Sequence, residues 1–249
     1  MLKIAVTGAT GRTGKEVITA INTEADVILT EVLVRENHEL LGKKVNDFIK
    51  LNNDEHSLVF TDTIDPSNLA DVLVDFSLPV ATRKYLTQCV QLARPMVIGT
   101  TGLSVEDKEE LRKAAARIPI VFAPNMSLGV NICYNLLESC AKNIDTNWQV
   151  AISEIHHKQK KDSPSGTALK MGEIIANYSD VNGATIQYSS IRAGDVVGEH
   201  RILFVCEGEQ IEITHRAMNR LVFAKGALMA AKWVVKKNPG LYTMQDVVR

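Results

Sequence analysis

Short apolar runs alternate with longer amphipathic segments through the first half of the chain. Runs typical of buried strands occur at 2–7, 27–34, 71–77, 95–102 and 120–123, with a shorter candidate at 58–60. Apolar residues at helical spacing lie between them, through Val17, Ile18 and Ile21 and over 79–92 and 104–118. Repeated alternation of strand and helix predicts an α/β fold with a doubly wound parallel sheet and right-handed crossovers.

The pattern changes after a helix that ends near residue 143. A strand at 148–155, a helix at 168–178 and strand-like runs at 186–191, 201–206 and 211–215 follow. This order predicts a second α/β domain with an open, antiparallel or mixed sheet. A long helix over about 219–237 carries its apolar residues along one side and would pack on the first domain. We therefore expect one domain of residues 1–126 and 216–249, and a second of residues 127–215.

Three glycines follow the first strand at a spacing typical of nucleotide-binding turns. Gly8, Gly11 and Gly14 form a GxxGxxG pattern between a strand and a helix, a variant of the dinucleotide-binding fingerprint. Gly8 would permit the tight turn, Gly11 the close approach of a pyrophosphate, and Gly14 the packing of the helix near the strand. A glycine-rich turn without a ligand is the alternative.

The end of the second strand bears on the choice of cofactor. Sites that prefer NADH place an acidic residue about 20 residues beyond the glycines to accept the ribose hydroxyls. This chain has Val34 there, followed by Arg35 and Glu36. Arg35, together with Arg12 from the glycine turn, would pair with a 2′-phosphate and favours NADPH. Glu36 keeps NADH open, and solvated loop charges are a third interpretation.

Small and hydroxyl-bearing residues recur where the expected parallel strands end. The segments are Gly8–Thr13, Phe76–Ser77, Gly99–Gly102 and Ala123–Met126. Ligands of open α/β sheets bind outside the carboxyl ends of the strands. The recurrence therefore predicts a cofactor lying across these ends, with ordinary turn chemistry as the competing account.

Residues 154–168 combine imidazole, ammonium and a helix start. His156 and His157 lie close to three lysines, and Ser163-Pro164-Ser165-Gly166-Thr167 has the composition of a helix N-terminus, with Ser163 or Ser165 as N-cap. The free N–H groups of a helix N-terminus favour an anion. This stretch therefore predicts a receptor for a small anion that needs a proton. A solvated strand end and a plain helix cap are the alternatives. If the strand continued through His157, the two histidines would face opposite sides.

Charge, hydropathy and cysteine content restrict the classes of partner and the location that the chain can have. The 249 residues carry a formal charge of -1, which gives no electrostatic case for nucleic acid or an anionic membrane. No apolar run approaches the roughly 20 residues that span a bilayer, and the N-terminus lacks a signal-peptide pattern. The cysteines, Cys89, Cys133, Cys140 and Cys206, form no CxxC pair, so neither a metal site nor a disulfide framework is expected. We expect a cytoplasmic protein.

Several segments, taken in order, resemble the dihydrodipicolinate reductase (4-hydroxy-tetrahydrodipicolinate reductase) family of diaminopimelate and lysine biosynthesis. The specific one is the pattern E-x-H-H-x-x-K-x-D-x-P-S-G-T-A, which residues 154–168 match in order and spacing. The others are 6–14, 74–77, 98–102, 123–131, 211–217 and 223–228. Together they cover nearly the whole chain.

The resemblance implies a Rossmann-type cofactor domain, and a substrate-binding and oligomerisation domain that joins a homotetramer. It implies NADPH- or NADH-dependent reduction of 4-hydroxy-tetrahydrodipicolinate, through its dehydrated imine. By position, the catalytic residues are His156 and Lys160. The matched substrate-binding positions are His157, Gly166 and Thr167, and the anion receptor expected from the residues themselves adds Lys160 and Ser165. The matched nucleotide contacts are Gly8, Ala9, Thr10, Gly11, Arg12, Thr13, Gly99, Thr100, Thr101, Ala123, Pro124, Asn125 and Met126. The strand ends described above add Arg35 and Phe76.

One departure and two rival functions remain. The family's acidic residue at the second strand end is Val34 here, which puts NADH preference in doubt. Another NAD(P)-dependent dehydrogenase with two domains is one rival. The second is a non-catalytic redox sensor that binds a dinucleotide, although neither a basic patch nor a helix-turn-helix pattern is evident.

Overall fold

The computed structural model describes residues 1–51, 58–67, 70–181 and 183–248. The chain forms two compact units, one of Met1–Ser127 with Leu221–Arg249 and the other of Leu128–Arg220. The first unit is therefore assembled from both ends of the sequence. No helix in the described part of the chain is long and apolar enough to cross a membrane.

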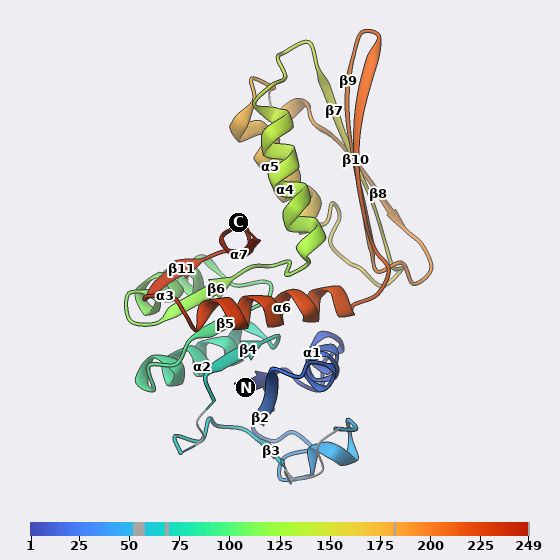
Figure 1. The fold of residues 1–249 in the computed structure, drawn as a ribbon. Helices are drawn as coiled ribbons and strands as arrows, with labels where there is room; N and C mark the ends of the chain where they lie inside the picture. The colour runs from blue at the N-terminus through green and yellow to red at the C-terminus, as the bar shows by residue number, and fades with distance from the viewer. Residues whose placement is uncertain (52–57, 68–69, 182, 249) are drawn as a thin grey trace. The chain divides into compact units, whose positions relative to one another are not determined.

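The first unit contains a seven-stranded sheet in which every pair of neighbouring strands is parallel (Figure 1). The strand order is β11-β6-β5-β4-β1-β2-β3. The chain thus builds outward from β1 in one direction and from β4 in the other, and this confirms the predicted doubly wound sheet. The strands are β1 (Leu2–Thr7), β2 (Val27–Leu33), β3 (Phe60–Thr61), β4 (Val72–Asp75), β5 (Met96–Ile98), β6 (Pro119–Phe122) and β11 (Gly240–Tyr242).

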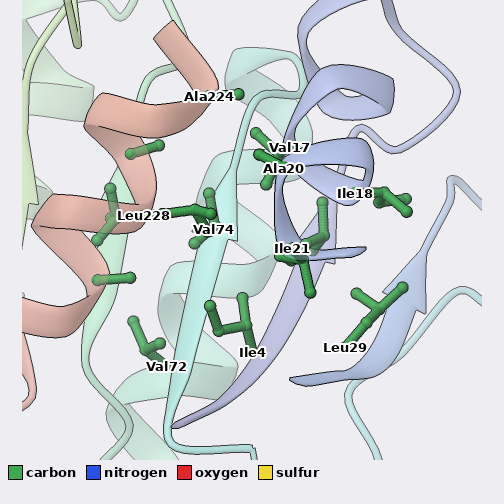
Figure 2. Close-up of a cluster of buried hydrophobic side chains, with 14 of the residues drawn as sticks. Ile4, Val17, Ile18, Ala20, Ile21, Leu29, Val72, Val74, Ala224 and Leu228 are labelled. Carbon is green, nitrogen blue, oxygen red and sulfur yellow. The ribbon is translucent and has the colours of Figure 1, made fainter. Parts of the chain in front are cut away.

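Helices cover both faces of this sheet. Successive residues of a strand point to opposite faces, so Val72 and Val74 of β4 pack in one core and Leu73 in the other. Figure 2 shows the first core, where Val74 lies among residues of α1 and α6. Residues of α1 (Arg12–Thr23), α6 (Leu221–Val234) and α7 (Met244–Val248) enter that core, and those of α2 (Pro79–Gln91) and α3 (Val105–Ala115) the other.

Two boundaries in the first unit differ from expectation for local reasons. Helix α3 begins at the expected place, where Ser104 and Asp107 form a capping box. It ends at Ala115, three residues before the predicted end at Ile118, because the residue before a proline avoids helical geometry and Pro119 opens β6. The pattern also missed β11 and α7, because segments this short show too few repeats of either period.

The second unit has a four-stranded mixed sheet, as predicted, in the order β10-β9-β7-β8. Strands β7 and β8 are parallel, and the other two pairs are antiparallel. Strand β9 begins at Gly198, three residues earlier than predicted, because the polar Glu199 and His200 hide its alternation. The elements are α4 (Leu128–Ala141), β7 (Gln149–His156), α5 (Gly166–Tyr178), β8 (Gln187–Arg192), β9 (Gly198–Cys206) and β10 (Glu209–Ala217), with short 3-10 helices η1 (Val45–Asp47) in the first unit and η2 (Gly183–Thr185) here.

One face of this sheet packs against α4 and α5 (Figure 1). On β7 the side chains of Val150 and Ile152 lie in that core, and Glu154 and His156 continue the same face with almost no exposure. The strand ends at His156, so the idea that His157 continues it does not hold. The periodicity of one strand therefore carries an acid and an imidazole into the interior side by side.

Gly226 of α6 offers a test of the first unit's packing. A Cβ at this position would lie 1.7 Å from the backbone oxygen of Met126, an atom that cannot yield as a flexible side chain does. We expect Gly226→Ala to lower the free energy of unfolding by about 1–3 kcal/mol through overpacking. Thermal unfolding measures it, with Met229→Ala on the exposed side of the same helix as the control. Equal stability of the two variants would contradict this packing.

Candidate active site

The glycine turn of the first unit is built by close backbone contacts. Gly8 has φ +73°, and a Cβ on it would lie 2.2 Å from the carbonyl oxygen of Phe76. A Cβ on Gly14 would lie 2.1 Å from the carbonyl oxygen of Gly8. Gly11 is the N-cap of α1 without a side-chain cap. The turn and the helix start therefore keep a surface of backbone N–H groups, which suits a phosphate.

A buried carboxylate organises the neighbouring strand ends. Asp75, the last residue of β4, is fully buried and accepts hydrogen bonds from the Ser77 N–H (3.0 Å) and hydroxyl (2.5 Å). The hydroxyls of Thr82 (2.5 Å) and Thr100 (3.0 Å) also donate to it. Burial raises the pKa of Asp75, and these donors oppose the rise. One side chain thus joins the loops that follow β4 and β5.

Further expected residues lie at the same strand ends. A Cβ on Gly99 would lie 2.2 Å from the Phe76 ring, so these two loops pack without space for a side chain. At the end of β6 the amide oxygen of Asn125 accepts the N–H of Ser127, and Met126 packs against α6. The structure therefore brings most of the predicted cofactor residues to one edge of the sheet: Gly8, Ala9, Thr10, Gly11, Phe76, Gly99, Thr100, Thr101, Ala123, Pro124, Asn125 and Met126.

Two exposed guanidinium groups accompany this edge. Arg12 opens α1 and Arg35 follows β2, and neither side chain has an ion pair or hydrogen bond within the described residues. His38, which the sequence did not single out, accepts the N–H of Leu40 at Nδ1 (3.1 Å) and lies with Nε2 3.4 Å from the Thr10 hydroxyl. Cationic and N–H donors thus gather beside the glycine turn.

In the second unit, Glu154 is the centre of the polar contacts. Its side chain is 1% exposed, and Arg192 forms a two-point ion pair with it, from Nη2 to Oε1 (2.7 Å) and from Nη1 to Oε2 (2.8 Å). His156 Nδ1 also donates to Oε2, and the N–H of Ser165 donates to Oε1 (3.2 Å). Burial raises the pKa of Glu154, but the hydrogen bonds from Arg192, Ser190 and His156 outweigh it and lower the pKa to about 2.

The contact with Glu154 assigns different roles to the two nitrogens of His156. An ionised carboxylate only accepts, so Nδ1 carries a hydrogen and Nε2 is the nitrogen that gains or loses a proton. A Cβ on Gly198 would lie 3.0 Å from Nε2, so the glycine leaves that position open. Burial lowers the pKa of His156, Glu154 raises it, and the charges of Lys160 and Arg192 lower it again, with a net lowering. Such a group is suited to proton transfer.

A second buried histidine connects this pair to α5. His200 Nε2 lies 3.0 Å from the hydroxyl of Ser165, the N-cap that accepts the Ala168 N–H. Its ring packs edge-on to that of His156, with centroids 5.1 Å apart. Burial, followed by the charge of His156, lowers the pKa of His200 to about 3, so this imidazole is neutral near pH 7. Ser165 is the N-cap, and Ser163, the other candidate, lies before it.

The remaining predicted residues gather at the start of α5. Lys160 Nζ forms an ion pair with Asp162 (2.8 Å), whose carboxylate also accepts the Gly166 N–H. The Thr167 side chain is hydrogen-bonded to Tyr134. His157 is half-buried, and its Nδ1 has no hydrogen-bond partner within the described residues. A carboxylate therefore already occupies the anion position that the sequence predicts.

The sequence did not assign roles to Glu154, Arg192 and His200. For Glu154 a signal existed, because it shares the buried parity of β7 with Ile152 and His156. Arg192 and His200 lie on other strands, and only the pairing of β8 and β9 with β7 brings them in.

Comparisons with known proteins agree over both units. Family models for dihydrodipicolinate reductase match residues 2–126 (N-terminus) and 129–248 (C-terminus). Proteins named 4-hydroxy-tetrahydrodipicolinate reductase from Pseudomonas fluorescens and Pseudoalteromonas atlantica are 42% and 40% identical over 267 and 265 residues, covering 100% of this chain and 99% of each relative. A dipicolinate-bound dihydrodipicolinate reductase from Paenisporosarcina sp. TG-14 has a TM-score of 0.80 over 98% of this chain and 97% of its own; at 23% identity this likeness concerns the fold.

Asp75 can be tested by a substitution of the same size. Four donors converge on its two oxygens, whereas an asparagine offers one oxygen and places N–H groups against hydroxyls. We expect Asp75→Asn to lower the free energy of unfolding by about 1–3 kcal/mol. Thermal unfolding at pH 7 measures it, and the exposed Asp47→Asn is the control. An unchanged melting temperature in Asp75→Asn would mean that this carboxylate does not join the loops.

Proposed function

The chain belongs to the dihydrodipicolinate reductase family, and from this membership we propose that it reduces 4-hydroxy-tetrahydrodipicolinate in lysine biosynthesis. The reaction delivers hydride from C4 of a nicotinamide to the dehydrated cyclic imine and adds a proton to the ring. The observation that supports this reaction is the pair of Glu154 and His156, which holds Nε2 as a proton-transferring atom close to Lys160 and the start of α5.

The second unit supplies the groups that a dicarboxylate substrate needs. Lys160 and the N-terminus of α5 would bind one carboxylate, which replaces Asp162 at the N–H of Gly166. His157 contributes a further donor. His156 or Lys160 then gives the proton as negative charge develops on the ring, and a cation at that point also stabilises the charge. Both His156 and Lys160 remain candidates for the proton donor, and His156 is the one whose ring is fixed by a hydrogen bond to Glu154.

The first unit fits a nicotinamide dinucleotide. At Gly8 and Gly14 the backbone comes so close that a Cβ would overlap carbonyl oxygens, which leaves N–H groups rather than side chains at the turn. Residues from the ends of β1, β4, β5 and β6 would hold the dinucleotide, with Arg12 and Arg35 at its ribose end. When bound, the cofactor supplies the hydride. Arg35 is exposed and its side chain has no partner among the described residues, which supports NADPH; NADH remains a second cofactor.

The second sheet has an apolar face that bears on assembly. The face of the second sheet opposite α4 and α5 carries partly exposed apolar side chains, among them Ile155, Ile191 and Leu203, with Ile191 49% exposed. Such a face suits pairing with another copy of the chain, and it supports the homotetramer joined through these sheets that the family resemblance implies. The substrate and cofactor are metabolites of the cytoplasm, where the enzyme would act.

The deciding experiment mixes the protein with freshly generated 4-hydroxy-tetrahydrodipicolinate and follows the absorbance of NADPH and, separately, of NADH. Consumption that depends on the substrate supports the reductase. A folded protein that binds the nucleotide but consumes neither cofactor contradicts it and favours a dinucleotide-binding sensor. Turnover only with other carbonyl or imine substrates would favour another two-domain dehydrogenase.

His156→Gln tests the proton donor. The amide cannot carry the proton that Nε2 transfers, so kcat should fall by about 10²–10⁴-fold. The affinity for NADPH, measured by its fluorescence on binding, should stay close to that of the native protein, because His156 lies outside the first unit. A loss of NADPH binding in this variant would assign His156 to the cofactor site or to the structure.

Arg35→Gln tests the choice of cofactor. An exposed guanidinium that pairs with the 2′-phosphate should affect NADPH alone, so the KM for NADPH should rise about tenfold while that for NADH stays unchanged. The control is Arg112→Gln, which removes an exposed arginine whose partner is Glu109 on the same helix. Equal changes for both cofactors would contradict a 2′-phosphate contact.

A further inference from the structure

Arg192 lies beside the reacting histidine through the register of two strands. The parallel pairing of β7 with β8 sets Arg192 opposite His156 and Ser190 opposite Glu154. Arg192 therefore reaches diagonally across to Glu154, which lies two residues before His156 on the same face of β7. Its side chain is 19% exposed and that of Glu154 is 1% exposed, so the ion pair is largely removed from water.

Each terminal nitrogen of Arg192 donates twice. Nη1 donates to Glu154 Oε2 (2.8 Å) and to the carbonyl oxygen of Ile191 (2.8 Å). Nη2 donates to Glu154 Oε1 (2.7 Å) and to the carbonyl oxygen of Asp162 (2.5 Å). The guanidinium is thus fixed by four contacts, and it connects the end of β8, the carboxylate on β7 and the loop that carries Lys160.

Glu154 is shared between Arg192 and His156. Oε2 accepts both Arg192 Nη1 and His156 Nδ1, while Oε1 accepts Arg192 Nη2 and the Ser165 N–H. A carboxylate that faced His156 alone would attract the imidazolium with its full charge. Arg192 takes up part of that charge and also fixes the plane of the carboxylate, and with it the direction of Nδ1.

We propose that Arg192 is a positioning residue for proton transfer: by sharing Glu154 with His156 it fixes which ring nitrogen faces the substrate and how readily that nitrogen releases its proton. The inference rests on the proposed reductase function, with His156 rather than Lys160 as the proton donor. In the step, the N–H bond at Nε2 breaks and its proton goes to the ring that accepts hydride. His156 is left neutral, with Nδ1 still donating to Glu154.

The charges around His156 come from every neighbouring element. Glu154 lies on its own strand, Arg192 on β8, His200 on β9 and Lys160 in the following loop. His200 is neutral near pH 7, and His215 on β10 lies beyond it, opposite His200. Glu154 is the anion bound to His156, Arg192 is the cation bound to Glu154, and Asp162 is the anion paired with Lys160.

Two substitutions should act in opposite directions. In Arg192→Gln the loss of a positive charge favours the imidazolium, so the midpoint of the His156 titration should move to higher pH. In Glu154→Gln the loss of a negative charge disfavours it, and the midpoint should move to lower pH. Because protonated His156 is the donor, the fall of kcat at alkaline pH should move in the same two directions. A role limited to folding would move neither.

The titration is measured in the full-length protein by NMR of its histidine rings labelled with carbon-13, which also reports the tautomer. His156→Gln identifies the resonance by its loss. Arg192→Lys keeps the charge without the two-point contact, so its midpoint should stay near the native one while kcat falls about tenfold or more. Arg112→Gln, at an exposed ion pair, is the matched control and should change neither quantity.

The removal of one partner of a buried pair can prevent folding. The double variant Glu154→Gln with Arg192→Gln removes both charges, and its midpoint should lie between those of the single variants. The proposal would be overturned if the Arg192→Gln midpoint moved to lower pH. It would also be overturned if the Arg192→Gln midpoint stayed at the native value and the midpoint of the double variant equalled that of Glu154→Gln. Because the NMR titration needs no turnover, it stays informative if the proposed reductase activity fails.

Discussion

The second unit depends on one electrostatic constraint, the burial of an ionised Glu154. Removal of a carboxylate from water costs several kcal/mol unless opposite charge and hydrogen-bond donors replace the solvent. Arg192, His156 and the Ser165 N–H supply them from β8, β7 and the start of α5. These three elements can satisfy the carboxylate only if they meet at one point. The same requirement places an imidazole, a lysine-bearing loop and a helix N-terminus together, which is the arrangement that proton transfer to a small anion needs.

A buried carboxylate also lies at a strand end of the first unit, but its surroundings are different. Asp75 is bound by hydroxyl and N–H donors without a cationic side chain among its hydrogen-bond partners in the described chain, so burial raises its pKa, whereas the ion pair lowers that of Glu154. Donors of this kind hold loops without placing a strong charge beside the glycine turn. We infer that Asp75 fixes the positions of the loops that follow β4 and β5. Glu154 fixes the position of His156 and also affects how readily His156 releases its proton.

Local patterns were sufficient for the fold and for part of the candidate site. Short apolar runs marked β1 and β4, period-two alternation marked β7, and the glycine spacing marked the turn before α1, because these signals depend on residues close in sequence. The same logic placed Ser165 at a helix start. It was weaker for β9, where buried polar residues replace apolar ones, and for β11 and α7, which are too short to show a period.

The sequence by itself determined the two kinds of sheet, the glycine turn, and the gathering of His156, Lys160 and Ser165 within one short stretch. Only the tertiary structure decided that Arg192, 38 residues beyond Glu154, completes the charge pair and that His200 contacts Ser165. The physical reason is register: which residues of β8 and β9 face β7 is fixed by hydrogen bonding and packing along the whole of each strand. The spacing of residues within β7 therefore does not predict which residues of β8 and β9 lie opposite it.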